Sequence, residues 1–318
     1  MRISHGFNPL SAPHAVTIGN FDGLHVGHQA MLARLQDVAR TRSLPTCVLS
    51  FEPHPREFFA AAQAPTRLSS LREKADWLRQ SGIDRLHVFH FNRAFAALSA
   101  PEFIRLALVE TLQARYVLVG DDFRYGARRA GDFELLAASG RALGFDADAL
   151  PTVELDGERA SSTAVRNALA AGDLAHAARL LGRPYSICGR IVHGDKLGRE
   201  LGYPTANVQL KHNRPPLSGI FAVTVSGING QSLPGVASLG VRPTMKAEGA
   251  APVLEVHLFD FDTDIYGRRV RVDFLHKLRD EAKFPDLRSL VAQISRDVEH
   301  AKNYLATSRR QTFKTTHG

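Results

Sequence analysis

The sequence predicts two domains: an α/β domain with a parallel sheet and helices on both faces, then an antiparallel β-barrel followed by a long helix. Three observations lead to this prediction. The chain has 318 residues, more than one hydrophobic core usually serves. Its first half alternates short apolar runs with amphipathic ones, which is the βαβ order of a parallel sheet. Its second half holds short apolar segments between Gly, Pro and Asn turns, which is typical of a closed or nearly closed barrel.

Composition favours a protein of the cytoplasm. Hydrophobic residues make up 44% of the chain and charged residues 23%, as in ordinary globular proteins. No apolar stretch approaches the ~20 residues of a membrane helix, and the N-terminus lacks the apolar core of a signal peptide. Cys47 and Cys188 form no CxxC pair, so we expect buried thiols in a reducing compartment.

Charge alone does not identify a partner. The net charge of +8 and the isoelectric point of about 9.8 are compatible with nucleic acid, an anionic membrane surface or small anions. The basic residues are scattered, except in the tail "TSRRQTFKTTHG" (307–318). We expect this tail to be disordered, because it is polar and basic.

The elements of the first half follow from hydrophobic periodicity. The helix after the first strand is expected to bury Met31, Leu32, Leu35 and Val38. One continuous helix is expected over 163–181, and "GRPYS" (182–186) is interpreted as a linker, with the domain boundary between residues 183 and 184. Strands are expected at 15–19, 46–51, 85–91, 116–120 and, more weakly, 145–150, and further helices at 70–82, 101–112 and 132–144.

The second domain is expected to span 184–306. A final amphipathic helix over 285–305 carries an apolar stripe of Leu287, Leu290, Val291, Ile294, Val298 and Ala301. The barrel strands are expected at 186–194, 205–210, 219–227, 233–240, 252–261 and 268–278.

The segment "GNFDGLHVGH" (19–28) places His25 and His28 where a strand turns into a helix. The N–H groups and positive end of that helix favour anions, and Gly23 and Gly27 allow backbone to approach a phosphate. Each imidazole can donate a hydrogen bond to a phosphate, or carry positive charge if protonated. The alternative is a pair of histidines that cap the helix.

A second segment, "ERASSTAVRNAL" (158–169), places three hydroxyls at a helix start, with Arg166 one turn inside. Such groups can bind a departing phosphate. Helix capping would explain a serine or threonine here but not Arg166. The hydroxyls belong to Ser161, Ser162 and Thr163.

A third segment, "VGDDFRYGARRAGDF" (119–133), combines carboxylates, aromatic rings and arginines in one loop. Asp121 or Asp122 is expected to cap a turn. Phe123 and Tyr125 are suited to stack on a flat ligand, although they could equally be core residues. This loop, the histidine segment and "FEPHP" (51–55) all follow predicted strands, and ligands of parallel sheets bind beyond the carboxyl ends of the strands.

These motifs, with "SSTAVR", resemble the N-terminal module of the bacterial bifunctional riboflavin kinase/FAD synthetases, a Rossmann-like nucleotidyltransferase fold. The resemblance implies adenylyl transfer from ATP to FMN, giving FAD and pyrophosphate. The FMN phosphate is already anionic near pH 7, since its second pKa is about 6, so positioning and charge stabilisation suffice without a base. His25, His28 and Arg166 would act in catalysis. ATP would be bound by Gly19, Asn20, Phe21, Asp22, Gly23, His25, His28, Ser161, Ser162, Thr163 and Arg166, and the flavin by Asp122, Phe123, Arg124 and Tyr125.

In the barrel half, "GRIVHGDKLGRELGYPTANVQL" (189–210) suggests a phosphate site. The stretch from Gly194 to Gly198, with Lys196 and Arg199, can fold over phosphates, although an exposed hairpin is the plainer interpretation. Thr205 and Asn207 lie two apart on one face of an extended segment. Their oxygens suit Mg²⁺, and a polar turn is the alternative.

"PVLEVHLFDF" (252–261) places Glu255 among apolar strand residues. A carboxylate in this setting is suited to proton abstraction, which the alcohol of riboflavin would need. The alternative is a solvated glutamate on the outer face of the barrel.

These segments, with "SLGVRPT", "DIYG" and "KLRDEAKFPDLRSLVAQISRD", resemble the riboflavin kinase module of the same family, and the resemblance spans about 15–305. It implies ATP binding by Gly194, Lys196, Gly198, Arg199, Thr205 and Asn207, with Mg²⁺ held by Thr205 and Asn207. It also implies Glu255 as the base and Arg279 near the flavin. The family commonly has asparagine where this chain has Ser238, so any contact of that amide is in question.

The expected ligands are therefore riboflavin, FMN, FAD, ATP and Mg²⁺, with no nucleic-acid or membrane partner; a homo-oligomer is compatible with the sequence. One alternative keeps the first domain but changes the acceptor, to nicotinamide mononucleotide or pantetheine phosphate. Another is a basic RNA-binding protein with a degenerate fold, which predicts salt-sensitive binding and no turnover. A zinc site with Cys47 and His54 is weaker, because the spacing fits no structural finger.

Overall fold

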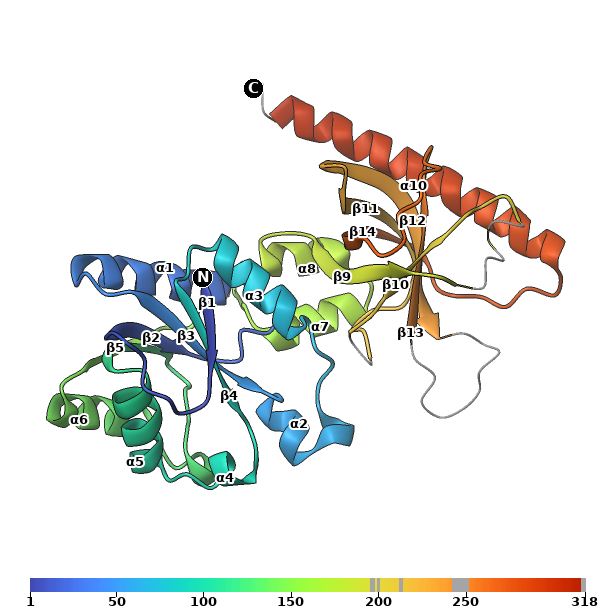
Figure 1. Ribbon diagram of the computed structural model, residues 1–318. Coiled ribbons are helices and arrows are strands. Elements are labelled where there is room, and N and C mark those ends of the chain that lie inside the picture. The colour runs from blue at the N-terminus through green and yellow to red at the C-terminus, as the bar shows by residue number, and fades with distance from the viewer. Residues whose placement is uncertain (195–197, 199–200, 212–213, 242–251, 316–318) are drawn as a thin grey trace. The chain divides into compact units, whose positions relative to one another are not determined.

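The computed structural model describes residues 1–194, 198, 201–211, 214–241 and 252–315 (Figure 1). Packing divides the chain into two units, which are described separately. The first comprises Met1–Pro65 and Leu71–Ser162, and the second comprises Thr66–Ser70 and Thr163–Gly318. The division falls at residues 162 and 163, whereas the expected boundary lies between residues 183 and 184. The second of the two helices before the barrel, Leu174–Leu181, packs against barrel strands.

The first unit is built on a six-stranded sheet in the order β1-β4-β3-β2-β5-β6, and every pairing in it is parallel. The predicted parallel sheet is therefore confirmed. The edge strand β1 was not predicted, because four residues with one partner strand carry too short a pattern. The strands are β1 (Arg2–His5), β2 (His14–Ile18), β3 (Thr46–Glu52), β4 (Arg85–His90), β5 (Ala114–Gly120) and β6 (Asp146–Leu150).

Helices cover both faces of this sheet, as predicted. They are α1 (Val26–Thr41), α2 (Pro55–Phe59), α3 (Leu71–Gln80), α4 (Arg93–Ala96), α5 (Ala100–Phe103) and α6 (Phe133–Leu143). A π-helical segment, Ile104–Thr111, continues α5, and a small hairpin of β7 (Glu154–Leu155) and β8 (Glu158–Arg159) precedes the end of the unit.

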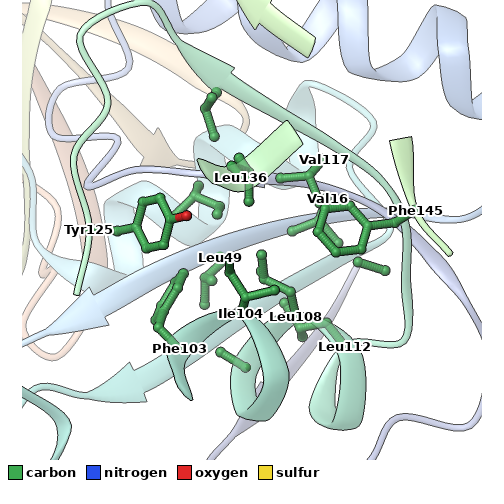
Figure 2. Packing of buried hydrophobic residues seen from close by; sticks show 14 of the residues in the cluster. Val16, Leu49, Phe103, Ile104, Leu108, Leu112, Val117, Tyr125, Leu136 and Phe145 are labelled. Carbon is green, nitrogen blue, oxygen red and sulfur yellow. The ribbon is translucent and has the colours of Figure 1, made fainter. Parts of the chain in front are cut away.

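Two apolar layers hold the helices to the sheet. Figure 2 shows the layer in which Ile104 and Leu108 of the π-helical segment and Leu136 of α6 meet Val16 and Val117 of the sheet. The opposite layer is formed with α1 and α3, and it includes Leu32, Leu35, Leu78, Leu86 and Leu118. Burial of these side chains is the main stabilising term of the unit.

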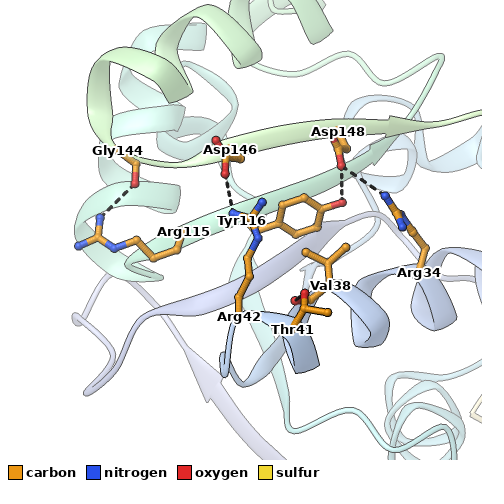
Figure 3. A network of polar contacts seen from close by, with 9 residues as sticks. All are labelled: Arg34, Val38, Thr41, Arg42, Arg115, Tyr116, Gly144, Asp146 and Asp148. Atoms are coloured by element: carbon orange, nitrogen blue, oxygen red, sulfur yellow. Dashed lines mark hydrogen bonds and ion pairs between the residues drawn. The ribbon is translucent and has the colours of Figure 1, made fainter.

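A polar network also fixes α1 on the sheet (Figure 3). The Tyr116 hydroxyl donates to the carboxylate of Asp148 at 2.9 Å, and Arg34 of α1 lies 3.9 Å from the same carboxylate. Arg42, just after α1, pairs with Asp146 at 2.5 Å and lies over the Tyr116 ring. Burial and the bond to Asp148 raise the pKa of Tyr116 to about 12, so its hydroxyl remains a donor. These contacts hold the helix that begins at the histidine motif.

In the second unit, α7 (Ser162–Ala170) and α8 (Leu174–Leu181) replace the single helix expected over 163–181. That prediction is wrong because Gly172 adopts a left-handed conformation (φ +77°), and Asp173 then caps α8 by accepting the His176 N–H at 2.8 Å. The buried face of α8 packs against the barrel strands β9 and β14.

The barrel is closed and antiparallel, in the order β10-β13-β12-β11-β14-β9, which confirms the predicted architecture. Alternate residues such as Leu254 and Val256 fill its interior. The strands are β9 (Tyr185–Val192), β10 (Ala206–Gln209), β11 (Gly219–Ile228), β12 (Gln231–Val241), β13 (Pro252–Leu258) and β14 (Arg269–Arg279).

The final helix, α10 (Leu287–Thr315), packs on the outside of the barrel through Val298, Ala301 and Leu305. Leu287, the first residue of the predicted stripe, is 60% exposed, so the stripe is buried only farther along. The helix also continues through residues 307–315, which were expected to be disordered, since neither Gly nor Pro interrupts this part of the chain.

A buried polar cluster joins β1 to the sheet. The Nε2–H of His87 donates to the Gly6 carbonyl at 2.9 Å, so the Nδ1 atom accepts from the Ser4 hydroxyl, also at 2.9 Å. Nearby, the Arg85 Nε–H donates to Nε2 of His14 at 3.2 Å. Burial lowers the pKa of His87 to about 4, and burial together with the Arg85 charge lowers the pKa of His14.

We therefore predict that the first unit loses stability as the pH falls from about 6.5 to 4. The unfolded chain binds a proton at His87 near its ordinary pKa of 6.5, whereas the folded chain does so only near 4. At about pH 5 this residue alone should cost about 2 kcal/mol of unfolding free energy relative to pH 7. Urea unfolding of His87→Gln, which keeps a donor but does not titrate, should depend less on pH; equal dependence would contradict the prediction.

Candidate active sites

Three of the sequence motifs come together at the carboxyl edge of the parallel sheet. The chain lays β3 and β4 on one side of β2 and then crosses to β5 on the other, so β2 and β5 flank the point where the strand order reverses. "GNFDGLHVGH" follows β2, "FEPHP" overlaps the end of β3, and "GDDFRYG" follows β5. Crevices at such points are the usual ligand sites of parallel sheets.

The backbone of the first motif is strained. Phe21 and Leu24 have φ values of +48° and +47°, a left-handed region that side chains rarely occupy, and Gly23 lies at +78°. Gly27 lies so close to the His25 ring that an added Cβ would approach it at 3.2 Å. Strain of this kind concentrates at functional sites. Burial of the Phe21 and Leu24 side chains holds these two residues in their strained conformation.

His25 caps α1, so the capping interpretation is confirmed for this residue. Its Nδ1 atom accepts the backbone N–H of His28 at 3.4 Å, which places the proton of the neutral ring on Nε2. The His25 and His28 rings stack with their centroids 3.7 Å apart, and Phe21 packs on His28 at 4.8 Å. The two imidazoles therefore form one layered group at the positive end of a 16-residue helix.

His28 is neutral at physiological pH. Burial, and then the charges of His25 and Lys74, hold the pKa of His28 well below its usual value of 6.5. Of the two roles considered for this imidazole, hydrogen-bond donor and cation, the structure favours the donor. Within the described part of the chain, the buried His28 Nδ1 and Asn20 Oδ1 atoms have no hydrogen-bond partner, as expected of groups that a ligand completes.

The predicted hydroxyls and arginine occupy different places. In the first unit, the Ser162 hydroxyl donates to the carbonyl of Asp22 in the histidine motif at 2.9 Å. Thr163 is exposed. In the second unit, Arg166 directs its Nε–H to the Thr66 carbonyl at 2.6 Å.

In the loop after β5, both aspartates have structural partners. Asp121 accepts the N–H of Thr152 at 2.9 Å, a long-range bond that lowers the pKa of this carboxyl and joins the loop to the segment after β6. Asp122, assigned to the flavin, pairs with Arg159 at 2.6 Å. This pair is exposed and therefore weak enough to exchange for a ligand.

The aromatic residues of the same loop are divided between core and surface. Tyr125 is buried in the layer of Figure 2 beside Phe103, so the core alternative holds for its ring. Phe123 stacks on Tyr125 at 5.4 Å and is only partly buried. Arg124, assigned to the flavin, pairs with Asp132 at 3.3 Å on the surface.

Two features of this edge were not predicted from the sequence. Phe58 and Phe59 of α2 are 38% and 68% exposed and pack edge-on against Phe91 after β4. Lys74 of α3 is buried, with its ammonium 3.1 Å from the Ser50 hydroxyl and 3.9 Å from Glu52. An apolar pair on a short helix does not indicate a ligand site in a single sequence, and a lysine within a helical pattern does not indicate that it will be buried.

His54 caps α2, and Cys47 lies in the core with its pKa raised to about 12 by burial.

In the barrel, strand register brings three predicted residues into one row. Glu255 of β13 lies opposite Asn207 of β10 on one side and Ser238 of β12 on the other. Directly paired residues share a face, with Cβ atoms about 5 Å apart. Glu255 is on the outward face, as the alternative interpretation stated, but it is half-buried rather than solvated.

The two glycines expected to bind nucleotide, Gly194 and Gly198, lie against side chains on this side of the barrel. Gly194 lies directly against the Asn207 side chain, which is 9% exposed, and Gly198 lies against the Thr205 hydroxyl, where an added Cβ would approach at 3.1 Å. A hydroxyl and an amide carbonyl under a glycine-lined backbone fit Mg²⁺, which prefers hard oxygen ligands. Lys196 and Arg199 lie outside the described residues.

Arg279 is held by an ion pair. Its guanidinium donates to the carboxylate of Asp297 on α10 at 2.6 and 2.9 Å, and Asp297 is 4% exposed. Gln293 donates to the same carboxylate, and Phe284 lies under the guanidinium. Arg279 therefore fastens β14 to α10, a role that was not predicted from the sequence.

The parallel sheet with its histidine motif, and the closed barrel with Glu255 between Asn207 and Ser238, define a two-domain transferase. Residues 8–164 match the family model of FAD synthetase, and residues 181–305 match that of riboflavin kinase. The chain belongs to the family of bifunctional riboflavin kinase/FMN adenylyltransferases. The family member from Pseudomonas fluorescens is 50% identical over 97% of this chain and 99% of its own length, and that from Escherichia coli strain K12 is 47% identical with the same coverage.

The fold of the whole chain also has a solved counterpart. The crystal structure of a protein from Streptococcus pneumoniae, described as a macrolide-efflux protein, is 31% identical and has a TM-score of 0.80. The match covers 95% of this chain and 99% of the other. This likeness supports the arrangement of elements within each unit.

We predict that removing the anion under Arg279 destabilises the barrel. Asp297→Asn leaves a partly buried guanidinium without its partner, which should lower the unfolding free energy by about 3 kcal/mol. The double variant Arg279→Met/Asp297→Leu should recover most of this loss, because it buries no lone charge. Urea unfolding monitored by far-UV circular dichroism measures both, and a fully stable Asp297→Asn variant would contradict the assignment.

Proposed function

We propose that each reaction of the family is carried out by the residues described above. The chain is a transferase that phosphorylates riboflavin with ATP to FMN and adenylylates FMN with ATP to FAD and pyrophosphate. The observation that carries the assignment of sites is the position of the two motif groups, one at the switch point of the parallel sheet and one on the paired row of the barrel.

For adenylyl transfer, the start of α1 and the surrounding motif bind the ATP phosphates. An oxygen of the FMN phosphate attacks the α-phosphorus of ATP, and the bond to the departing pyrophosphate breaks. Neutral His28 and the Nε2–H of His25 donate hydrogen bonds to the phosphate oxygens, where charge accumulates in the transition state. Ser161 and Ser162, which belong to the same unit, receive the pyrophosphate.

The flavin of this reaction requires a flat apolar surface. Phe59 is an exposed ring beside Phe58 and Phe91, and Phe123 presents a partly buried ring after β5. We assign the isoalloxazine to these residues, with Asp122 and Arg124 as polar neighbours. Tyr125 supports Phe123 from the core instead of touching the ligand.

For phosphoryl transfer, Glu255 accepts the proton of the riboflavin hydroxyl. The oxygen of that hydroxyl attacks the γ-phosphorus of ATP, and ADP departs. Thr205 and Asn207 hold Mg²⁺, which when bound neutralises charge on the ATP phosphates. Gly194 and Gly198 let backbone approach the phosphates, and Lys196 and Arg199 add positive charge. Arg279 acts on the flavin indirectly, through the segment that it holds to α10.

The setting of the enzyme is also a proposal. In the part of the chain that the structure describes, no helix has the length and apolar character needed to cross a membrane. Cys47 is a buried free thiol, and Cys188 is half-buried. We propose a cytoplasmic enzyme that takes small-molecule partners; association of several copies is a further proposal.

We predict that His28→Ala stops the pathway at FMN. Loss of a preorganised donor should lower the rate of FAD formation about 100-fold or more, while riboflavin phosphorylation continues. Chromatographic separation of FMN and FAD over time, from riboflavin, ATP and Mg²⁺, measures both steps. His300→Ala, an exposed histidine on α10, is the matched control; undiminished FAD formation by His28→Ala would refute the site.

Conversely, Glu255→Gln should block riboflavin phosphorylation and leave the adenylylation of supplied FMN intact. The amide keeps the size of the side chain but cannot accept the proton, so we expect a loss of about 100-fold or more. The same chromatography, started from riboflavin or from FMN, separates the two activities. Loss of both activities in a correctly folded variant would overturn the assignment of one reaction to each unit.

A further inference from the structure

The segment that carries Thr205 and Asn207 is poorly held at its start. Pairing between β10 and β13 begins with Ala206 opposite Val256, so Thr205 and Pro204 precede the ladder. Pro204 also has no N–H with which to bond a neighbouring strand. The position of Thr205 therefore depends on contacts other than strand pairing.

One such contact comes from His257, the next residue of β13. Its Nδ1 atom lies 2.9 Å from the carbonyl oxygen of Pro204. A carbonyl only accepts hydrogen bonds, so Nδ1 carries the proton and donates. The Tyr203 ring packs edge-on against the imidazole, with centroids 5.5 Å apart and an angle of 80°. The side chain thus extends the strand pairing by one step beyond the ladder.

His257 also shares a face with the proposed base. Residues two apart on a strand point to the same side, so His257 and Glu255 both lie on the outward face of β13. The inward residues between and beside them, Leu254, Val256 and Leu258, fill the barrel interior. Loss of the imidazole therefore removes the tie to Pro204 without opening the barrel core.

We propose that His257 is a positioning residue of the kinase: it holds the Pro204 peptide so that Thr205 and Asn207 face the nucleotide at a fixed distance from Glu255. The inference rests on the proposed roles of Thr205 and Asn207. Groups that orient metal ligands in this way typically contribute 10- to 100-fold to metal affinity or activity.

The test uses the full chain with riboflavin and MgATP. His257→Ala should raise the KM for MgATP about tenfold, with a much smaller change in kcat. His257→Asn places an amide N–H near the position of Nδ1 and should restore the KM, whereas His257→Phe keeps the ring beside Tyr203 without a donor and should not. Urea unfolding monitored by far-UV circular dichroism reports that the barrel of each variant is folded, and conversion of supplied FMN to FAD should be unchanged. His276→Ala, an exposed histidine of β14 that stacks on Tyr304, is the matched control.

A double variant separates this proposal from the one on which it rests. If His257 acts through Thr205, then His257→Ala should add little to the KM increase of Thr205→Ala. Should Thr205→Ala leave the KM unchanged, the ligand role falls and this proposal with it. Only the positioning role is overturned if Thr205→Ala raises the KM and His257→Ala does not. The same holds if the KM increase of the double variant equals the product of the two single increases, which means that the residues act independently.

Discussion

Strand pairing is the constraint on which both sites depend. Neighbouring parallel strands end at the same edge, so the pairing of β2 with β3 and β5 collects three separate loops in one place. Paired antiparallel residues share a face, so the register of β13 with β10 and β12 places Asn207 and Ser238 on either side of Glu255. A slip of one residue would turn Glu255 into the barrel interior. The sites are therefore as precise as the backbone ladders that carry them.

The polar groups attached to this frame differ in what they do at neutral pH. His28 is kept neutral by burial and by nearby positive charge, so it contributes directional hydrogen bonding, while the start of α1 supplies the positive field. This division suits a reaction whose nucleophile is already an anion. The kinase reaction begins from an alcohol, and the barrel accordingly offers a carboxylate. In the proposed assignment, the difference in acceptor chemistry accounts for the different side chains of the two nucleotide sites.

Much of this could be predicted from the sequence, for physical reasons. Hydrophobic periodicity revealed the sheet, the barrel and α10, because long repeated patterns average out local exceptions. The motifs at strand ends were found because chemistry-bearing residues stand out next to glycine. What the sequence left open or missed depended on tertiary contacts. The sequence could not decide between core and ligand for Tyr125, Gly172 divides a predicted helix through a backbone angle, and the pair of Arg279 with Asp297 forms only after α10 has packed.

The burial of Lys74 is a further feature that the sequence pattern does not predict. Its helix has an ordinary amphipathic pattern, and nothing in that pattern indicates that an ammonium group will be buried beside Ser50 and Glu52. Once the sheet places β3 next to β2, however, that charge acts on His28 and helps to keep it neutral. A residue can thus contribute to the protonation state of a histidine in a candidate site without belonging to any motif. For this reason the electrostatics of a site follow from the packed structure, even where its principal residues can be named from the sequence.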